Sequence, residues 1–236
     1  MLEIKMDVVY NDYIHFFEVT EMKTYLFDFD GTLVDSMPTF GTMMKRILDE
    51  NNISYGEDFI KIITPLGLKG TAEYCINELK LNMTMEEFFK TVEAYFYEEY
   101  AHNIPAKKNV IEVLNKLKKE GASLNLLTAS PHFTLDICMK RLGLFDLFDN
   151  VWSCDDFNTT KTNPEIYKMA AEKIGVPVEE ILFLDDNYNA DKTAKQAGMK
   201  VCGVYDDSSS EYETEIRSIT DYYIKDFSEL LSICFS

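Results

Sequence analysis

Two pairs of carboxylates stand directly behind apolar runs of the sequence. Asp28 and Asp30 follow the letters TYLF, and Asp185 and Asp186 follow the letters EILFL. A carboxylate at the end of a buried strand costs free energy unless it is paired, hydrogen-bonded or bound to a metal. Carboxylate ligands from two segments, without clustered His or Cys, favour a hard cation over a transition metal. We therefore expect a Mg²⁺ site built from these aspartates.

Hydroxyl groups and one lysine follow other apolar runs. Thr128 and Ser130 come after ASLNLL, and Lys161 lies in the loop after NVWSC. Taken alone, each has an ordinary interpretation as a strand end, a helix cap or a solvated lysine. Ligands of an open parallel sheet bind at the carboxyl ends of its strands, so we expect all these side chains at one edge with the aspartates. There, Lys161 and Thr128 can hold phosphate oxygens.

The composition excludes some partners. The chain of 236 residues has 41 acidic and 23 basic side chains and a formal charge of −18, which disfavours nucleic acids and anionic membranes. The odd number of cysteines and the lack of a C-x-x-C motif predict free thiols in a reducing, cytoplasmic location. Without an apolar run of about 20 residues, we predict no membrane span. The expected protein is a monomer or a weak homo-oligomer.

Short apolar runs alternate with helical patterns through most of the chain. Strands are predicted over residues 25–30, 122–128, 150–154, 180–186 and 200–205, with 221–226 as a candidate sixth. Helices are predicted over 108–121, 130–143, 163–175 and 188–198, the second with Ser130 as its N-cap and Pro131 at its first position. This alternation predicts an α/β fold, with a Rossmann-like parallel sheet core covered by helices.

Residues 37–105 break that alternation and are expected to form an inserted α-helical domain. Their clearest helix begins with the capping box of Thr84 and Glu87. The core domain is then 22–36 together with 106–236, preceded by an extension over 1–21. That extension is either a small hairpin turning at Asn11-Asp12 or a segment before a natural start at Met22.

Four motifs together resemble the haloacid dehalogenase superfamily. DFDGTLVDS is similar to its first motif, D-x-D-G-T-hydrophobic-hydrophobic-D-S, and LLTAS, KTNPEIY and LFLDDNYNADKTAKQAG follow in the order of the second to fourth. The resemblance covers residues 22–232, and the helical insertion matches the cap of the phosphoglycolate phosphatase and β-phosphoglucomutase branch. The chain departs from the pattern at Thr162, Asn187 and Ala190, so Asp191 is expected to face a different direction.

The resemblance implies roles for the candidate residues. Asp28 is implied as the nucleophile, and Asp30 as the general acid and then the general base. Mg²⁺ is implied to bind Asp28, Asp186 and the backbone carbonyl of Asp30, with Asp185 as a candidate further ligand. Thr128 and Lys161 are implied to hold the phosphoryl group.

Other residues are candidates for binding the rest of the substrate. These are Ser130, His132 and Lys69, the last in an expected cap loop over residues 64–74. The predicted function is a Mg²⁺-dependent phosphatase that hydrolyses a small phosphorylated metabolite through an aspartyl-phosphate. A sugar phosphomutase is the first alternative, although Phe40 stands where such relatives carry a cap-linker His, and Pro131-His132 replaces their Lys-Asn.

Two further alternatives come from different classes. A phosphonate hydrolase needs a Schiff-base lysine, for which Lys45, Lys61 and Lys69 are candidates. A non-catalytic binding module on the same fold has no use for the acid–base group Asp30.

Overall fold

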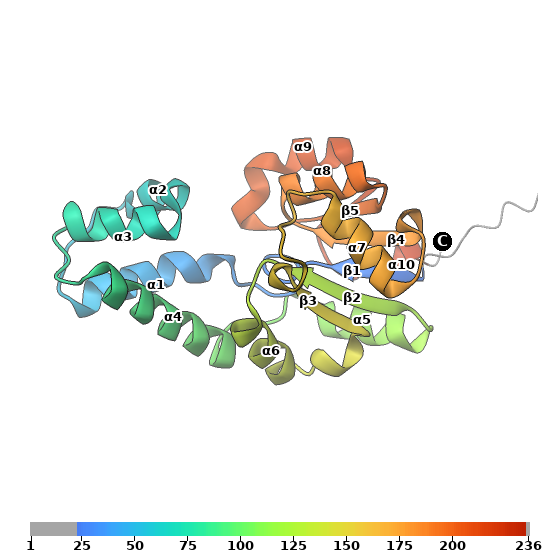
Figure 1. The fold of residues 1–236 in the computed structure, drawn as a ribbon, viewed down its shortest axis with the longest axis horizontal. Helices are drawn as coiled ribbons and strands as arrows, with labels where there is room; N and C mark the ends of the chain where they lie inside the picture. The colour runs from blue at the N-terminus through green and yellow to red at the C-terminus, as the bar shows by residue number, and fades with distance from the viewer. Residues whose placement is uncertain (1–22, 235–236) are drawn as a thin grey trace, which may run out of the picture.

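A six-stranded parallel sheet forms the centre of the computed structural model, which describes residues 23–234 (Figure 1). The strands are β1 (Thr24–Phe27), β2 (Ser123–Thr128), β3 (Asn150–Ser153), β4 (Ile181–Asp185), β5 (Lys200–Val204) and β6 (Tyr222–Ile224). Their order is β3-β2-β1-β4-β5-β6, and every neighbouring pair is parallel. The strand order therefore changes direction at β1, which is where α/β sheets bind ligands. The candidate sixth strand is confirmed.

Helices cover both faces of this sheet. Along β1, Tyr25 and Phe27 belong to one core cluster and Leu26 to the other, because successive side chains point to opposite faces. The first cluster is covered by α5 (Val110–Lys119), α6 (His132–Arg141) and α10 (Glu229–Cys234). The second is covered by α7 (Glu165–Ile174) and α8 (Tyr188–Ala197), with α9 (Glu213–Ile219) beside α8 (Figure 1). The predicted α/β fold class is confirmed.

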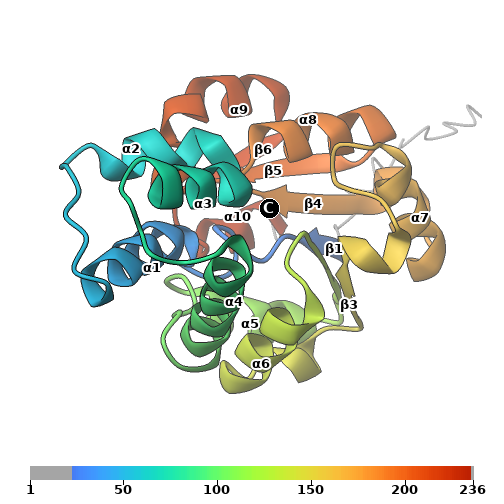
Figure 2. The same ribbon diagram turned by 60° about the vertical axis from the view of Figure 1, so that its left-hand side comes forward.

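Four helices form a separate body beside the sheet, as Figures 1 and 2 show. They are α1 (Met37–Glu50), α2 (Phe59–Ile63), α3 (Gly67–Asn77) and α4 (Met85–His102), and we call them the helical insert. The insert has its own apolar core, in which Met43, Ile47, Phe88 and Val92 are buried. The inserted helical domain is thus confirmed as part of the fold class, while its exact bounds stay a prediction.

Local chemistry sets the ends of α4. The predicted capping box is present, since the Thr84 amide donates to Glu87 Oε2 at 2.8 Å and the Glu87 amide donates to Thr84 Oγ1 at 3.2 Å. Near the other end, Arg141 of α6 donates to the carbonyl oxygens of Tyr100 and Ile104. The last turn of α4 is therefore attached to a core helix, because Arg141 satisfies carbonyls that a helix end leaves unpaired.

Three local expectations were wrong. Residues 64–74 are not a loop: a 3₁₀ turn over Thr64–Leu66 leads directly into α3. Strand β1 stops at Phe27, so Asp28 and Asp30 lie in the turn behind it. Helix α6 has Pro131, not Ser130, before its first residue, because the Ser130 hydroxyl donates to Asp30 instead.

Several further features bear on the sequence interpretation. All five cysteines are buried and none of them forms a disulfide, as predicted. Within residues 23–234, no helix combines the length and apolar character needed to cross a membrane. The two alternatives for residues 1–21, a hairpin at Asn11-Asp12 or a start at Met22, lie outside the described residues.

The insert core offers a test of the packing. Phe88→Ala empties a fully buried site on α4 and should lower the free energy of unfolding by about 3–5 kcal/mol. Tyr97→Ala on the same helix is the matched control, since Tyr97 is 48% exposed, and should cost at most about 0.5 kcal/mol. Urea unfolding of both variants measures the difference, and equal losses would contradict the described core.

Candidate active site

The predicted polar side chains meet at the carboxyl edge of the sheet. Asp28 follows β1, Thr128 ends β2, and Asp185 ends β4 with Asp186 directly behind it. Lys161 reaches them from the segment between β3 and α7. Four chain segments that are far apart in the sequence thus contribute to one place, as parallel strands require.

The centre of the site is an acidic cluster of Asp28, Asp185 and Asp186. Each offers one carboxylate oxygen, and the three oxygens lie within 4.8 Å of one another. Lys161 Nζ donates to a carboxylate oxygen of Asp28 and to Asp185 Oδ2, the second at 2.8 Å. Thr32 Oγ1 donates to Asp186 Oδ1 at 3.0 Å. Among the described side chains, one ammonium and one hydroxyl therefore donate hydrogen bonds to three buried carboxyl groups.

Burial and mutual repulsion shift the pKa values of this cluster. Burial raises the pKa of Asp28 to about 7; Lys161 opposes the shift, and Asp185 and Asp30 add to it. Burial, then Asp185 and Asp28, raise the pKa of Asp186 well above its usual range. For Lys161, burial alone lowers the pKa, but the Asp185 and Asp28 carboxylates outweigh it and hold the ammonium charged. Ionising these carboxyl groups together is therefore unfavourable, and a bound cation can offset the repulsion between them.

The residues present fit a Mg²⁺ ion. Their ligands are all oxygens, as this hard cation prefers. Asp191 on α8 is fully buried, and neither carboxylate oxygen has a hydrogen-bond partner among the described residues. Burial, then Asp185 and Asp186, raise the pKa of Asp191. Asp191 is not a member of the three-residue acidic cluster, so the expectation that it faces a different direction stays a prediction.

A glycine keeps the turn behind β1 close to the cluster. Gly31 has φ +79°, and a Cβ added there would lie 2.6 Å from Asp186 Oδ2. The position therefore needs glycine for both its backbone angle and its close approach. The carboxyl group of Asp30, the residue before it, is not a member of the three-residue acidic cluster. That its backbone carbonyl binds the metal remains a prediction.

Asp30 is held by three hydroxyl groups from different parts of the chain. Ser36 Oγ donates to Asp30 Oδ1 at 2.6 Å, and Tyr100 OH donates to the same oxygen at 2.5 Å. Ser130 Oγ donates to Asp30 Oδ2. Burial, then Asp30, raise the pKa of Tyr100, so its phenol remains a donor. Asp30 thus connects three parts of the chain. These are the segment between β1 and α1 that contains Ser36, which we call the first linker, the end of α4, and the β2–α6 loop.

The remaining predicted site residues have other immediate contacts. The Thr128 hydroxyl accepts a hydrogen bond from the Ser130 amide at 3.0 Å and retains its own proton to donate. His132 lies between Asp136 and Asp156, 2.9 Å from each, and hydrogen bonds to Asp136 and then Asp156 raise its pKa.

Lys69 faces solvent on the first turn of α3. Its side chain is 80% exposed, and its ammonium lies 4.0 Å from the Glu73 carboxylate. That Lys69 binds the substrate stays a prediction.

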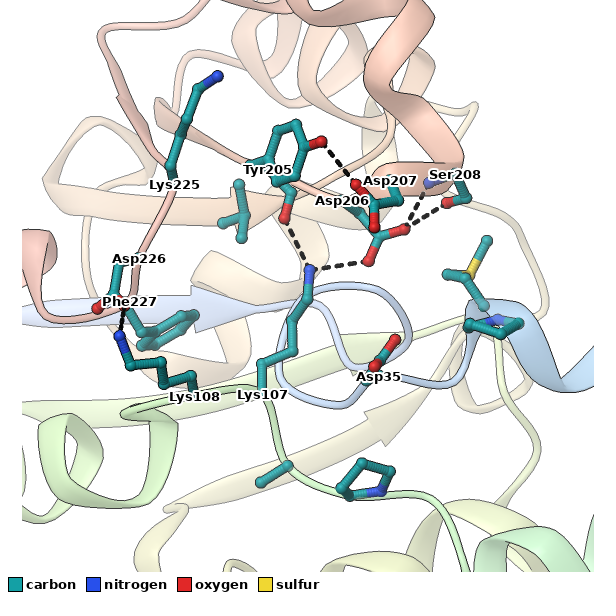
Figure 3. A pocket seen from close by; sticks show the side chains of 15 residues that line it. Asp35, Lys107, Lys108, Tyr205, Asp206, Asp207, Ser208, Lys225, Asp226 and Phe227 are labelled. Carbon is teal, nitrogen blue, oxygen red and sulfur yellow. Dashed lines mark hydrogen bonds and ion pairs between the residues drawn. The ribbon is translucent and has the colours of Figure 1, made fainter.

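A cavity of about 650 Å³ lies where the two linkers join the insert to the sheet (Figure 3). Lys107, from the second linker, donates to Asp206 Oδ2 at 2.8 Å and to the Tyr205 carbonyl at 2.7 Å. The same ammonium donates to the carbonyl of Gly31, the residue after Asp30. Lys107 therefore connects the second linker, which is the segment between α4 and α5, to the turn that contains Asp28 and Asp30.

Sequence reasoning missed Ser36, Tyr100, Lys107 and Asp206. Ser36 stands inside motif one, so its position was a usable signal. Tyr100 lies on α4 near aromatic residues such as Phe88 and Phe96, which pack in the apolar cores. In the sequence, Lys107 is an ordinary linker lysine. Only their distance in space from Asp30 and Gly31 distinguishes them.

Comparison with known proteins places the chain among hydrolases. A family model described as haloacid dehalogenase-like hydrolase matches residues 25–204. The candidate phosphatase YhcW of Bacillus subtilis (strain 168) is 28% identical over 189 residues, which are 76% of this chain and 81% of that protein. The pyrophosphatase PpaX of Bacillus velezensis is 28% identical over 221 residues, which are 88% of this chain and 94% of that protein.

A solved structure supports the fold. A candidate β-phosphoglucomutase from Thermotoga maritima has a TM-score of 0.79 at 23% identity, covering 90% of this chain and 98% of that one. Fold and site together define an α/β enzyme with a buried acidic centre and a helical insert. The chain belongs to the haloacid dehalogenase-like hydrolase family, and its enzyme class is the predicted phosphoric monoester hydrolase.

The raised pKa of Asp28 predicts a pH dependence of stability. Between pH about 4 and about 7 an unfolded Asp28 is ionised, whereas the folded carboxyl, buried and with a pKa of about 7, keeps its proton. The unfolded state then binds fewer protons, so the free energy of unfolding falls as pH rises through this window. Urea unfolding of metal-free protein should show this decline, reduced by a few kcal/mol in Asp28→Asn. Identical slopes in the two proteins would contradict the assigned shift.

The linker contacts predict a second stability difference. Lys107→Met leaves the 5% exposed Asp206 without its cation and should cost about 2–4 kcal/mol in urea unfolding. Lys108→Met is the matched control: Lys108 pairs with Asp226 but is 82% exposed, so its loss should stay below about 1 kcal/mol. In an Asp206→Asn background the Lys107 effect should shrink. An unchanged effect there would mean that the ion pair is not its source.

Proposed function

We propose that this protein is a Mg²⁺-dependent phosphatase that hydrolyses a small phosphorylated metabolite through an aspartyl-phosphate on Asp28. The observation that carries the proposal is the separation of two carboxyl groups in one turn. Asp28 is bonded to Lys161 in the acidic cluster, while Asp30 is held by Ser36, Tyr100 and Ser130. A nucleophile and an acid–base group need such different surroundings.

In the first half-reaction, a carboxylate oxygen of Asp28 attacks phosphorus. The bond between phosphorus and the substrate oxygen breaks, and Asp30 gives its proton to the leaving alkoxide. Lys161, charged and buried beside Asp28, offsets negative charge on the phosphoryl oxygens, and the Thr128 hydroxyl offers them a donor. Phosphoryl transfer depends mainly on such positioning and charge neutralisation.

In the second half-reaction, Asp30 accepts a proton from water as the water oxygen attacks phosphorus. The bond from phosphorus to Asp28 breaks, which releases inorganic phosphate and restores the carboxylate. Asp28, Asp185 and Asp186 would hold Mg²⁺. When bound, the ion supplies positive charge that neutralises the phosphoryl oxygens and keeps the carboxylates ionised.

A phosphomutase remains the second candidate because a solved relative of the fold carries that description. A mutase must hold a doubly phosphorylated intermediate and so needs cations beyond the phosphoryl site. Phe40, in place of the cap-linker His, lines the cavity next to Asp30. Net release of phosphate without conversion between sugar phosphate isomers favours the phosphatase.

Substitution of the two motif-one aspartates tests the proposal. Asp28→Asn should lower phosphate release by about 10⁴-fold or more, because nucleophile and metal ligand are lost together. Asp30→Asn should cost about 10²–10⁴-fold, the range of an acid–base group, with Mg²⁺ affinity little changed in calorimetric titration. Asp28→Asn activity within tenfold of wild type would exclude the aspartyl-phosphate. Collapse of Mg²⁺ affinity in Asp30→Asn would show that its role is misassigned.

A further inference from the structure

A second cavity, of about 470 Å³, opens beside Asp30 between the helical insert and the core. Its walls come from the first linker and α1, the end of α4, and the β2–α6 loop with the start of α6. A group that leaves from a phosphoryl on Asp28 must receive its proton from Asp30. The cavity is therefore placed to hold the leaving alcohol, and its size suits a small organic group.

The walls of this cavity are mostly apolar. Met37, Phe40, Phe96, Pro131 and Phe133 all line it. Met37 and Phe133 are 42% and 46% exposed, although both side chains are large and apolar. Exposed apolar groups gathered around a cavity mark a place where a ligand covers them.

The hydroxyl groups of the cavity are already committed as donors. Ser36, Tyr100 and Ser130 each donate their single O–H to Asp30. Thr134 Oγ1 donates to the Pro131 carbonyl at 3.1 Å. A hydroxyl has one proton and two lone pairs, so these side chains offer an occupant only lone pairs. Lone pairs accept from an alcohol or an amide but repel an anion.

The cavity also lacks positive charge. None of the described residues that line it is Lys, Arg or His, and Asp30 is its one acidic member. Lys161 is engaged with Asp28 and Asp185, and His132 with Asp136 and Asp156. A carboxylate or second phosphate placed here would lose its hydration without gaining a cation, which is unfavourable.

We propose that the substrate is a phosphate monoester whose leaving alcohol is uncharged and has an apolar face, and that this cavity selects it. The inference rests on the proposed phosphatase function, since it takes Asp30 as the group that protonates the leaving oxygen. If the cavity selects a neutral leaving group, then anionic substrates such as pyrophosphate and 2-phosphoglycolate are hydrolysed poorly. Specificity lies at the junction of insert and core rather than at Lys69.

The test compares two aryl esters matched in size and shape. 4-Carbamoylphenyl phosphate has a neutral leaving group, and 4-carboxyphenyl phosphate has an anionic one. With Mg²⁺ and wild-type protein, kcat/KM should favour the neutral ester by about tenfold or more. Equal values, or a preference for the carboxylate, pyrophosphate or 2-phosphoglycolate, would overturn the inference and leave the phosphatase standing. Failure to release phosphate from any of these compounds would overturn both.

Charge insertion then tests the cavity itself. Phe133→Arg and Met37→Arg place a cation in the lining from two different helices, α6 and α1, at positions exposed enough to accept it. Each should shift the ratio of the two kcat/KM values toward the carboxylate ester by about tenfold. Met169→Arg on α7, 37% exposed and outside the cavity, is the matched control and should leave the ratio unchanged.

The ratio does not depend on the fraction of active protein, because both esters are measured on one preparation. It therefore stays informative if a variant folds poorly. Ratios in Phe133→Arg and Met37→Arg equal to those of wild type and Met169→Arg would exclude this cavity as the leaving-group site.

Discussion

Burial of negative charge at one edge of the sheet is the constraint on which this structure depends. Asp28, Asp185, Asp186 and Asp191 are all at most 6% exposed, and Lys161 is the cation bonded among them. An unpaired buried carboxylate costs several kcal/mol. A lysine, a hydroxyl group and a metal ion can each reduce this cost. The fold brings Lys161 and Thr32 to the carboxylates at the ends of β1 and β4.

The environment changes completely over two residues. Asp28 lies among carboxylates and a lysine, whereas Asp30 is surrounded by hydroxyl groups. The sharp turn at Gly31 allows this, because it folds the chain back against Asp186. One of the hydroxyls, from Tyr100, belongs to the helical insert. The position of the Asp30 carboxyl group thus depends on how the insert sits on the core.

The linkers reinforce that dependence. Lys107 joins the second linker to Gly31 and to Asp206 behind β5, and Arg141 joins α6 to the last turn of α4. The turn with both aspartates, the second linker and the segment behind β5 are consequently joined by hydrogen bonds. The charged groups around Asp28 are next to a cavity with mostly apolar walls, so the proposed function assigns reaction chemistry and substrate choice to different residues.

The sequence by itself determined the class of fold and indicated the main residues of the candidate site. Alternating apolar runs and helix caps specify the layers, because strand and helix periods are local properties. Motif one and the strand-end rule predicted a site containing Asp28, Asp30, Lys161, Asp185 and Asp186, and the structure brings Asp28, Lys161, Asp185 and Asp186 together at one sheet edge. Once a parallel sheet is inferred from the local pattern, all its strands end at the same edge, so the residues that follow them are expected there.

Only the tertiary structure decided the partners of those residues. Tyr100 reaches Asp30 across 70 positions in the chain, and Lys107 reaches Gly31 across 76. The burial of Asp191 on α8 was not evident from the sequence, because one residue changes the direction of a side chain on a helix by about 100°, and the orientation of α8 on the sheet was unknown. Contacts between distant segments depend on how helices pack on the sheet, and packing geometry is not encoded in any local pattern. The apolar cavity beside Asp30 is such a product, since its walls come from four separate elements.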